Sequence, residues 1–257
     1  MLYRDRLRAG SFGGDSERYD RARPSYPSAV LDGLVGPVGQ EVVDVGCGTG
    51  IAARLFAARG CRVVGVEPDE RMAAVARRNG TDVELSTFEE WDPAGRVFDL
   101  VVSGQAWHWV NPGLGAAKAA SILRSAGVLA VFWNCGRPDP MLRAVFDGIY
   151  ERIAPGIDSH SVVLGHGTED RFDVAVDGID RTGLFEPVAR ASHAWEKRYS
   201  RDEWLDHLPT HSDHQTLPAE QLDELLRAVG QAIDKHGGSF TMGYDTIVIS
   251  AARRSRS

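Results

Sequence analysis

A run of β-branched residues that ends in a carboxylate and three alternating glycines constrains this fold more than any other feature. The segment runs from Val42 to Gly50 and reads VVDVGCGTG. A short, nearly unbroken apolar run is typical of a parallel strand buried on both faces. Glycines allow the chain to turn sharply and let a ligand approach the backbone. The segment therefore predicts a buried strand, a ligand-binding turn and a following helix.

The same alternation of apolar runs and helical segments continues to Asn134. It predicts an α/β fold built on a doubly wound, mostly parallel sheet, in which ligands bind outside the carboxyl ends of the strands. The predicted strands are 42–45, 62–66, 99–102 and 128–133, and the predicted helices are 51–59, 70–79 and 114–124.

The chain changes character after Asn134. Two late strands are expected to form a hairpin-like pair that completes the sheet with an antiparallel edge strand, and the intervening helices are expected to form a cap. The late strands are 188–199 and 244–252, and the helices are 141–153, 201–207 and 218–236. The predicted domains are an N-terminal lid segment (1–35), a cofactor-binding Rossmann-like core (36–135), and the cap helices with the last two strands (136–257).

The composition narrows the class of partner. A formal net charge of -7 over 257 residues disfavours a nucleic-acid substrate, because polyanion binding needs an excess of basic residues. The longest apolar runs are much shorter than the roughly 20 residues of a membrane helix. The first ten residues lack the apolar stretch of a secretory signal. We therefore expect a cytoplasmic monomer or homodimer that binds a small molecule and neither nucleic acid nor membrane.

Two kinds of cofactor fit the glycine-rich turn. One is a dinucleotide, and the other is a nucleoside that carries a charged amino acid and no phosphate. Residues Gly48 to Ala53 match G-x-G-x-x-A, a form of the dinucleotide-binding fingerprint. Glu67 follows the second strand and is placed to bind the two ribose hydroxyls of either cofactor. Asp44 distinguishes the two kinds of cofactor. A buried carboxylate repels the pyrophosphate of a dinucleotide and attracts an amino group or a sulfonium. Met72 and Phe88 are candidates to contact an adenine, although a core-filling role explains Met72 equally well.

Five segments in order resemble the motifs of the class I S-adenosylmethionine-dependent methyltransferases. They resemble most closely the small-molecule branch whose fourth strand ends in a QAWHW-type sequence, and residues 19–27 (YDRARPSYP) resemble the lead-in of that branch. The resemblance implies a seven-stranded Rossmann-like methyltransferase fold with helical cap insertions, and methyl transfer from S-adenosyl-L-methionine. The five segments are VVDVGCGTG, VVGVEPDERM, TFEEW, FDLVVSGQAWHWV and LRSAGVLAVFWN.

The resemblance also implies the cofactor-binding residues. The glycines and Asp44 would line the methionine part, Glu67 would hold the ribose, and Met72 and Phe88 would flank the adenine. Ser103 and Gln105 would face the reacting methyl group. The full implied set is Tyr19, Arg23, Asp44, Gly46, Gly48, Gly50, Glu67, Pro68, Met72, Thr87, Phe88, Ser103 and Gln105.

The chain departs from the family pattern before the fifth strand. Related sequences carry an acidic residue in the preceding helix and a Pro-Gly-Gly before the strand, whereas this chain has Ala119-Ala120 and Ser125-Ala126-Gly127. We interpret the departure as a change in the scaffold that leaves cofactor binding intact.

Several histidines are candidates for acid-base chemistry. His108, between two tryptophans, is the candidate catalytic base, and a structural histidine bonded to the backbone is the alternative. His160 and His166 in the expected cap loop are further candidates to meet substrate. His207, His211 and His214 have a spacing that a metal site could use, but Pro209 interrupts the helix, so no metal site is expected.

Three functions remain open on the sequence. The leading one is methyl transfer to a small molecule by in-line displacement, with an oxygen, nitrogen or carbon nucleophile. The second is an S-adenosylmethionine-binding protein without methyl transfer, such as a cyclase or a ligand sensor. The third is an NAD(P)-dependent dehydrogenase, for which the second half of the chain offers no hydride-transfer residue.

Overall fold

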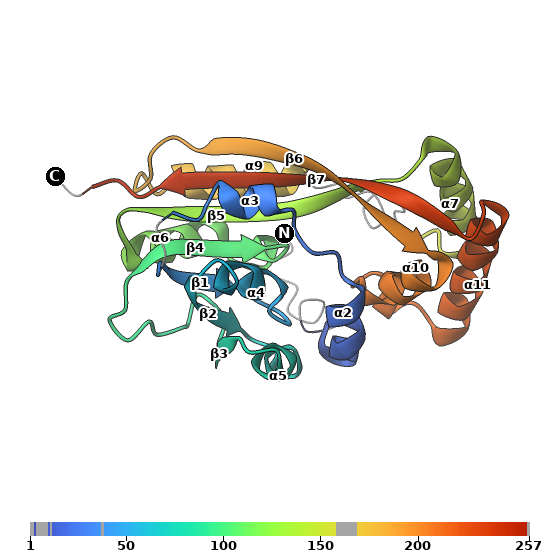
Figure 1. Cartoon of the computed structure of the whole chain (residues 1–257), viewed down its shortest axis with the longest axis horizontal. Coiled ribbons are helices and arrows are strands. Elements are labelled where there is room, and N and C mark those ends of the chain that lie inside the picture. The colour runs from blue at the N-terminus through green and yellow to red at the C-terminus, as the bar shows by residue number, and fades with distance from the viewer. Residues whose placement is uncertain (1–2, 4–9, 11, 37–38, 158–168, 256–257) are drawn as a thin grey trace.

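The computed structural model describes residues 3, 10, 12–36, 39–157 and 169–255. Its centre is one seven-stranded sheet with the order β3-β2-β1-β4-β5-β7-β6 (Figure 1). The strands are β1 (Glu41–Val45), β2 (Arg62–Glu67), β3 (Asp82–Leu85), β4 (Phe98–Gly104), β5 (Leu123–Arg137), β6 (Ala189–Ser200) and β7 (Ser239–Ala252). The prediction of a doubly wound, mostly parallel, seven-stranded sheet is confirmed.

One strand runs against the others. The first five strands pair in parallel, whereas β7 pairs antiparallel with both β5 and β6. The expected antiparallel pair at the end of the sheet is confirmed, since the edge strand β6 pairs antiparallel with β7. The reversed strand is β7, which lies one position in from the edge, and the edge strand β6 runs in the direction of β5. Insertion of β7 between β5 and β6 pairs both of its edges over residues 243–250, so this long strand is not left as an exposed edge there.

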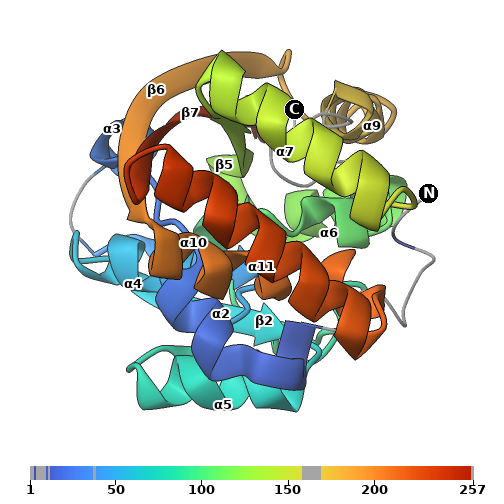
Figure 2. The same cartoon turned by 90° about the vertical axis from the view of Figure 1, so that its right-hand side faces the viewer.

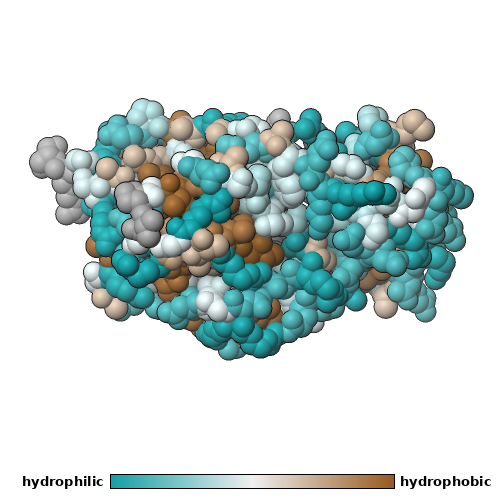
Figure 3. Space-filling model, viewed as in Figure 1, coloured by the Kyte–Doolittle hydropathy of each residue, from teal (hydrophilic) through white to brown (hydrophobic). Residues whose placement is uncertain are grey.

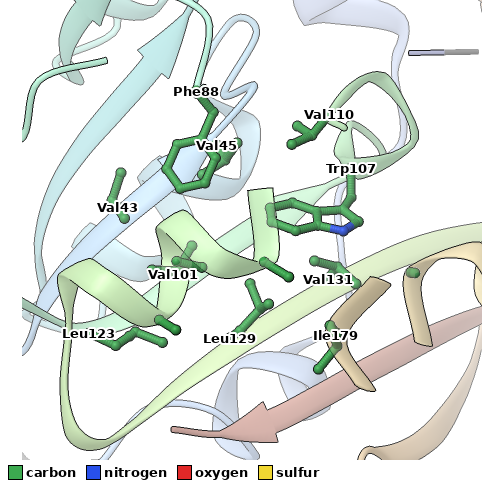
Figure 4. Close-up of a cluster of buried hydrophobic side chains, with 14 of the residues drawn as sticks. Val43, Val45, Phe88, Val101, Trp107, Val110, Leu123, Leu129, Val131 and Ile179 are labelled. Atoms are coloured by element: carbon green, nitrogen blue, oxygen red, sulfur yellow. The ribbon is translucent and has the colours of Figure 1, made fainter. Parts of the chain in front are cut away.

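Helices cover both faces of the sheet. One face packs against α6 and α9, whose side chains join the largest hydrophobic cluster together with β1, β4 and β5 (Figure 4). The other face packs against α3 and α4. The helices around the sheet are α2 (Ser16–Ala22), α3 (Ser28–Asp32), α4 (Ile51–Ala57), α5 (Glu70–Arg78), α6 (Pro112–Ile122) and α9 (Glu169–Asp180), with the short 3-10 turns η2 (Phe12–Asp15) and η3 (Trp107–Trp109).

Helix α9 was not predicted from the sequence, and it belongs to the core. Its buried side chains Phe172 and Ile179 pack in the main cluster, where Ile179 lies near Leu129 and Val131 of β5 (Figure 4). The last third of the chain therefore contributes a helix to the core layer as well as the cap and two strands.

A second hydrophobic cluster forms the cap beyond the end of the core. The far ends of β5, β6 and β7 extend past the other strands and carry α7, α10 and α11 (Figure 1). Seen from that end, α10 lies between α11 and α2 (Figure 2). The elements of the cap are α7 (Pro140–Ile153), α10 (Arg201–His207), η4 (Leu208–Thr210), η5 (His214–Thr216) and α11 (Ala219–Lys235).

The surface of the molecule is unevenly polar. On the face drawn in Figure 3, hydrophobic residues gather over the middle and left of the sheet, while the end around α10 and α11 is mostly hydrophilic. Within the described ranges, no helix combines the length and the apolar character that crossing a membrane requires.

Candidate functional site

The glycine-rich turn lies where the ends of β1, β2 and β4 meet. Gly46 and Gly48 have φ values of 64° and 56°, in the left-handed region that favours glycine. The amide N–H of Gly46 donates to the carbonyl of Val66 at 2.8 Å. A Cβ on Gly46 would lie 2.6 Å from the Cβ of Ala106. Glycine at this position therefore lets the turn fit between β2 and the loop after β4.

Glu67, at the end of β2, is held by the backbone around it. Its Oε2 accepts from the amide of Gly48 at 2.9 Å, and its Oε1 accepts from the amide of Asp69 at 3.0 Å. The residue is buried, and this burial raises the pKa of the carboxyl to about 7. The two amide donors lower the pKa, but by less than burial raises it. Each oxygen keeps a second lone pair. The carboxylate is thus oriented and can still accept hydrogen bonds from a pair of hydroxyls.

Asp44 is the most deeply buried acid of the site, with 1% of its surface exposed. Neither of its carboxylate oxygens makes a well-aligned hydrogen bond among the described residues, although the backbone of Ala53 lies close enough to oppose the rise in its pKa. Burial raises the pKa of Asp44 to about 7, and the charge of Glu67 adds to the rise. A buried carboxylate without a well-aligned hydrogen bond is costly unless a cation or donor completes it. The site therefore favours a positively charged or hydrogen-bond-donating ligand group.

The side walls of the pocket are mostly apolar. Met72 comes from α5, and its Cε would lie 3.4 Å from a Cβ placed on Gly48. Phe88 is buried, stacks on Trp91 at a centroid distance of 6.3 Å and meets Trp107 at 6.1 Å (Figure 4). These aromatic contacts fix the ring that faces the pocket.

Gln105 enters the pocket in an unusual backbone conformation. Its φ is 58°, which is uncommon for a residue with a side chain. Its amide donates to the carbonyl of Phe132 at 2.8 Å, and its Nε2 donates to the carbonyl of Asn134 at 3.2 Å. Both bonds come from β5, so the neighbouring strand holds the strained residue in place.

The structure brings ten of the thirteen predicted cofactor residues to one pocket. These lining residues are Tyr19, Asp44, Gly46, Gly48, Glu67, Pro68, Met72, Thr87, Phe88 and Gln105. Gly50, Ser103 and Arg23 do not line it. Gly50 begins α4 with a φ of 83°, where a Cβ would lie 2.6 Å from the hydroxyl of Thr81. The Ser103 hydroxyl donates to the carbonyl of Val45 at 2.8 Å. Gly50 and Ser103 therefore stabilise the turn on the side that faces away from the pocket.

Arg23 follows the end of α2 and points toward the cap. Its Nη2 donates to the carbonyl of Thr210 at 2.7 Å, and its Cζ lies 4.9 Å from the centre of the Tyr19 ring. Its predicted contact with the cofactor stays a prediction, because the pocket is lined by Tyr19 and not by the guanidinium.

Sequence reasoning missed a group of aromatic lining residues. Phe12 makes edge contacts with Tyr19 and Trp109 at centroid distances of 5.9 and 6.0 Å, so the N-terminal segment meets the loop after β4. Tyr26 packs on Gly104, where a Cβ would lie 2.6 Å from the tyrosine hydroxyl. Tyr26 and Trp109 lie within segments that carried the family resemblance, and that signal could have identified them. The missed lining residues with aromatic or charged side chains are Phe12, Tyr26, Asp69 and Trp109.

His108, the predicted catalytic base, is not among the residues that line the pocket, although Trp109 and Val110 are. Its Nδ1 accepts a hydrogen bond from the indole Nε1 of Trp133 at 3.2 Å. A neutral imidazole that accepts through Nδ1 carries its hydrogen on Nε2. This arrangement favours the structural role, and the catalytic role stays a prediction.

The other histidine candidates divide between described and undescribed segments. His160 and His166 lie outside the described residues. His207 and His211 approach each other at 3.0 Å between their Nε2 atoms, and the Nε2 of His214 lies 2.8 Å from the hydroxyl of Tyr150. In the part of the chain that the structure describes, no group of three or more histidine, cysteine or acidic side chains is arranged to hold a metal ion.

Comparisons with known proteins fit this geometry. Residues 43–131 match the model of the methyltransferase domain family. An uncharacterized methyltransferase of Mycobacterium tuberculosis is 38% identical over 126 residues, which cover 48% of this chain and 52% of that protein. A trans-aconitate 2-methyltransferase of Variovorax paradoxus is 33% identical over 141 residues, which cover 50% of this chain and 52% of that protein. The chain spans about half the length of the curated relatives it matches.

Solved structures share the fold over most of the chain. A candidate type II methyltransferase from Anaeromyxobacter dehalogenans superposes with a TM-score of 0.65 at 23% identity, covering 91% of this chain and 99% of that one. Phosphoethanolamine N-methyltransferase 2 of Haemonchus contortus, solved with S-adenosyl-L-methionine, gives a TM-score of 0.51 at 14% identity and covers 99% of this chain and 60% of that one. The sheet described above is thus the Rossmann-like methyltransferase fold.

Proposed function

We propose that this chain is an S-adenosyl-L-methionine-dependent methyltransferase that acts on a small-molecule acceptor. The observation that carries the proposal is the pair of buried carboxylates, Asp44 and Glu67, at the turn after β1. A cofactor with an ammonium and a sulfonium offsets the burial of such acids, whereas a pyrophosphate would be repelled by them. The match of residues 43–131 to the methyltransferase domain supports the same cofactor.

The roles of the lining residues follow from their positions. Glu67 would accept hydrogen bonds from the two ribose hydroxyls, and Met72 and Phe88 would enclose the adenine. The methionine part would lie along Gly46 and Gly48, with its ammonium toward Asp44. Gln105, held rigidly by β5, would face the methyl end, and Tyr19 would cover the cofactor from α2. Pro68 and Thr87 would complete the wall around the ribose and adenine.

Methyl transfer from a sulfonium is an in-line displacement, so the main task of the protein is alignment. Alignment alone can lower the barrier by about 7 to 11 kcal/mol in favourable cases. The hydrogen bond from Trp133 to His108 Nδ1 suits a residue that shapes the loop after β4. A carboxylate or thiolate acceptor would then need no base, while an alcohol or ammonium acceptor would require the catalytic role predicted for His108.

Calorimetry with three ligands tests the cofactor. We expect S-adenosylmethionine and S-adenosylhomocysteine to bind at micromolar concentration, and NAD or NADP not to bind at the same concentration. Binding of NAD or NADP without binding of S-adenosylmethionine or S-adenosylhomocysteine would favour the alternative of an NAD(P)-dependent dehydrogenase.

A turnover assay then separates methyl transfer from the alternative of a cyclase or ligand sensor, which would bind the same cofactor. Incubation with S-adenosylmethionine and a panel of carboxylic acids, phenols and amines should give a product heavier by one methylene, together with S-adenosylhomocysteine. The cytoplasmic location and the monomeric or homodimeric state remain predictions, which fractionation and light scattering can check.

A further inference from the structure

Buried polar nitrogen atoms without partners gather between the end of α2 and the cap. Within the described residues, hydrogen-bond partners are missing for Arg23 Nε, Trp204 Nε1 and His214 Nδ1, while His207 Nδ1 makes no well-aligned hydrogen bond but lies near the backbone of Ala22. Trp204, His207 and His214 each expose 4% of their surface or less. An unpaired buried polar atom destabilises the fold, so a group of such atoms marks a place that a ligand or water completes.

The side chains that carry these atoms form one continuous group. The ring centroids of Trp204 and His207 are 5.0 Å apart, those of His207 and His211 are 4.7 Å apart, and those of His211 and His214 are 5.9 Å apart. Arg23 joins the group through its bond to Thr210, which lies in the turn between His207 and His211. We call Arg23, Trp204, His207, His211 and His214 the cap cluster.

Arg23 gives the cap cluster a positive charge that no acid among the described residues neutralises. Arg18 and Arg21, in the same helix, both pair with Asp206 at 3.1 and 2.8 Å. Arg23 pairs with no carboxylate in the ranges that the structure covers, since its one bonded partner is the Thr210 carbonyl. Its charge is close enough to lower the pKa of His211 and His214 further, although burial is the larger cause. The imidazoles are therefore neutral at pH 7.

The unpartnered atoms of the cap cluster include two nitrogens that are always donors and a third, His214 Nδ1, that we assign as a donor. Arg23 Nε and Trp204 Nε1 carry hydrogens in every protonation state relevant here. The bond to His214 is the one hydrogen bond of the Tyr150 hydroxyl among the described residues, and we assign the hydroxyl as its donor. His214 then carries its hydrogen on Nδ1, the atom without a partner. Donors around a guanidinium suit an anion.

Arg23 also connects the cap cluster to the cofactor pocket. Its guanidinium stacks on the ring of Tyr19, and Tyr19 lines the pocket. Its charge reaches Tyr26, another lining residue, where it opposes the rise in pKa that burial causes. Helix α2 lies beside α10 when viewed from the cap end (Figure 2). A molecule bound between Tyr19 and the cap would therefore meet the cofactor on one side and Arg23 on the other.

We propose that Arg23 and the cap cluster bind an anionic group of the methyl acceptor, so that this chain acts on acidic small molecules bearing a carboxylate or a phosphate. This inference rests on the proposed methyltransferase function, and it moves Arg23 from the cofactor to the acceptor. Two other arginines of the second half of the chain are already engaged, since Arg137 pairs with Asp245 and Arg198 bonds Ser239.

Calorimetry on R23Q and a matched control tests the proposal. The control is R21Q, which removes a guanidinium from the same helix that already pairs with Asp206. Each protein is first titrated with S-adenosylhomocysteine and then, saturated with it, with citrate, inorganic phosphate or glycerol. We expect at least one anion to bind the wild type and glycerol not to bind. R23Q should weaken anion binding at least about tenfold, while R21Q should stay within about twofold.

The cofactor titration serves as the second readout. R23Q should bind S-adenosylhomocysteine as the wild type does, and R23K, which keeps the charge but loses the planar donors, should bind the anion with intermediate affinity. Because R23K tests the same site, the proposal stays testable if R23Q does not fold. A preference for citrate or for phosphate assigns the acidic group as carboxylate or phosphate.

Three results would overturn the proposal. They are the failure of both anions to bind, unchanged anion binding in R23Q and R23K, and a loss of S-adenosylhomocysteine affinity in these variants. The anion titrations are repeated without S-adenosylhomocysteine, so that failure of the cofactor to bind, which contradicts the proposed function, is recorded separately from failure of the anions to bind.

Discussion

The cofactor pocket and the cap cluster bury titratable side chains of opposite kinds. At the pocket, two carboxylates have their pKa raised to about 7, and one of them makes no well-aligned hydrogen bond among the described residues. In the cap cluster, three imidazoles have their pKa lowered by burial beside an arginine without an acid. The pocket thus suits a cation, and the cap cluster suits an anion. A cationic methyl donor and an acidic acceptor would bring these charges together.

The largest expected effect on cofactor binding is at Glu67. We expect E67A to weaken S-adenosylhomocysteine binding at least about 100-fold, because two charge-assisted hydrogen bonds to the ribose are lost. Calorimetry checks the affinity. E70A is the matched control, since Glu70 begins α5 nearby and pairs with Arg77 on the surface. Equal affinities for E67A and the wild type would remove Glu67 from the cofactor site.

Replacement of Asp44 should weaken cofactor binding and, at high pH, stabilise the folded protein. The folded chain holds this carboxyl at a pKa of about 7 and the unfolded chain near 3.8, so the wild type loses stability as pH rises through this window. D44N has no such titration. Its free energy of unfolding should therefore rise relative to the wild type by up to about 4 kcal/mol between pH 4 and pH 8. Its affinity for S-adenosylmethionine should fall about tenfold.

Denaturant unfolding without ligand across this pH range measures the effect, with D173N on the exposed side of α9 as the control for lost charge. A flat difference between D44N and the wild type would show that Asp44 is ionised and satisfied in the free protein.

In the cap cluster, burial of a histidine should make the free energy of unfolding change with pH in the opposite direction. Burial lowers the pKa of His214 to about 4, while the unfolded imidazole titrates near 6.5. The wild type is therefore most stable above pH 6.5 with respect to this group and loses stability as pH falls toward 4. H214Q should gain up to about 3 kcal/mol relative to the wild type between pH 7.5 and pH 4.

The measurement for His214 is the same denaturant series. The control is H236Q, which changes an exposed histidine at the end of α11. If H214Q gained stability with rising pH instead, the contrast between the two regions would fail.

A smaller effect on stability is expected at the glycine that supports the turn beside the pocket. Gly50 and Gly80 have nearly the same φ, 83° and 86°, but a Cβ on Gly50 would lie 2.6 Å from the Thr81 hydroxyl and one on Gly80 would meet nothing within 4 Å. We expect G80A to lose about 1 kcal/mol from backbone strain and G50A at least about 2 kcal/mol, because a clash adds to the strain. Thermal unfolding compares them, and equal losses would mean that packing at the turn is loose.

The sequence predicted the pocket better than the cap for a physical reason. Glu67 and Asp44 are positioned by the strands that contain them, and parallel strands bring their carboxyl ends to one edge whatever the rest of the chain does. The cap cluster joins Arg23 to His207 and His214 across more than 180 residues, and no local pattern encodes such contacts. The position of β7 in the sheet and the packing of α9 on the core also depend on contacts between distant parts of the chain, so the sequence did not predict them.

A crystal structure with S-adenosylhomocysteine bound tests the central claim most directly. We predict that the ribose hydroxyls lie on the carboxylate of Glu67, the amino group points toward Asp44, and the sulfur faces Gln105 with the Arg23 guanidinium free of the cofactor carboxylate. A structure in which the homocysteine carboxylate bonds Arg23, or in which the ligand lies away from the turn at Gly46, would contradict the account.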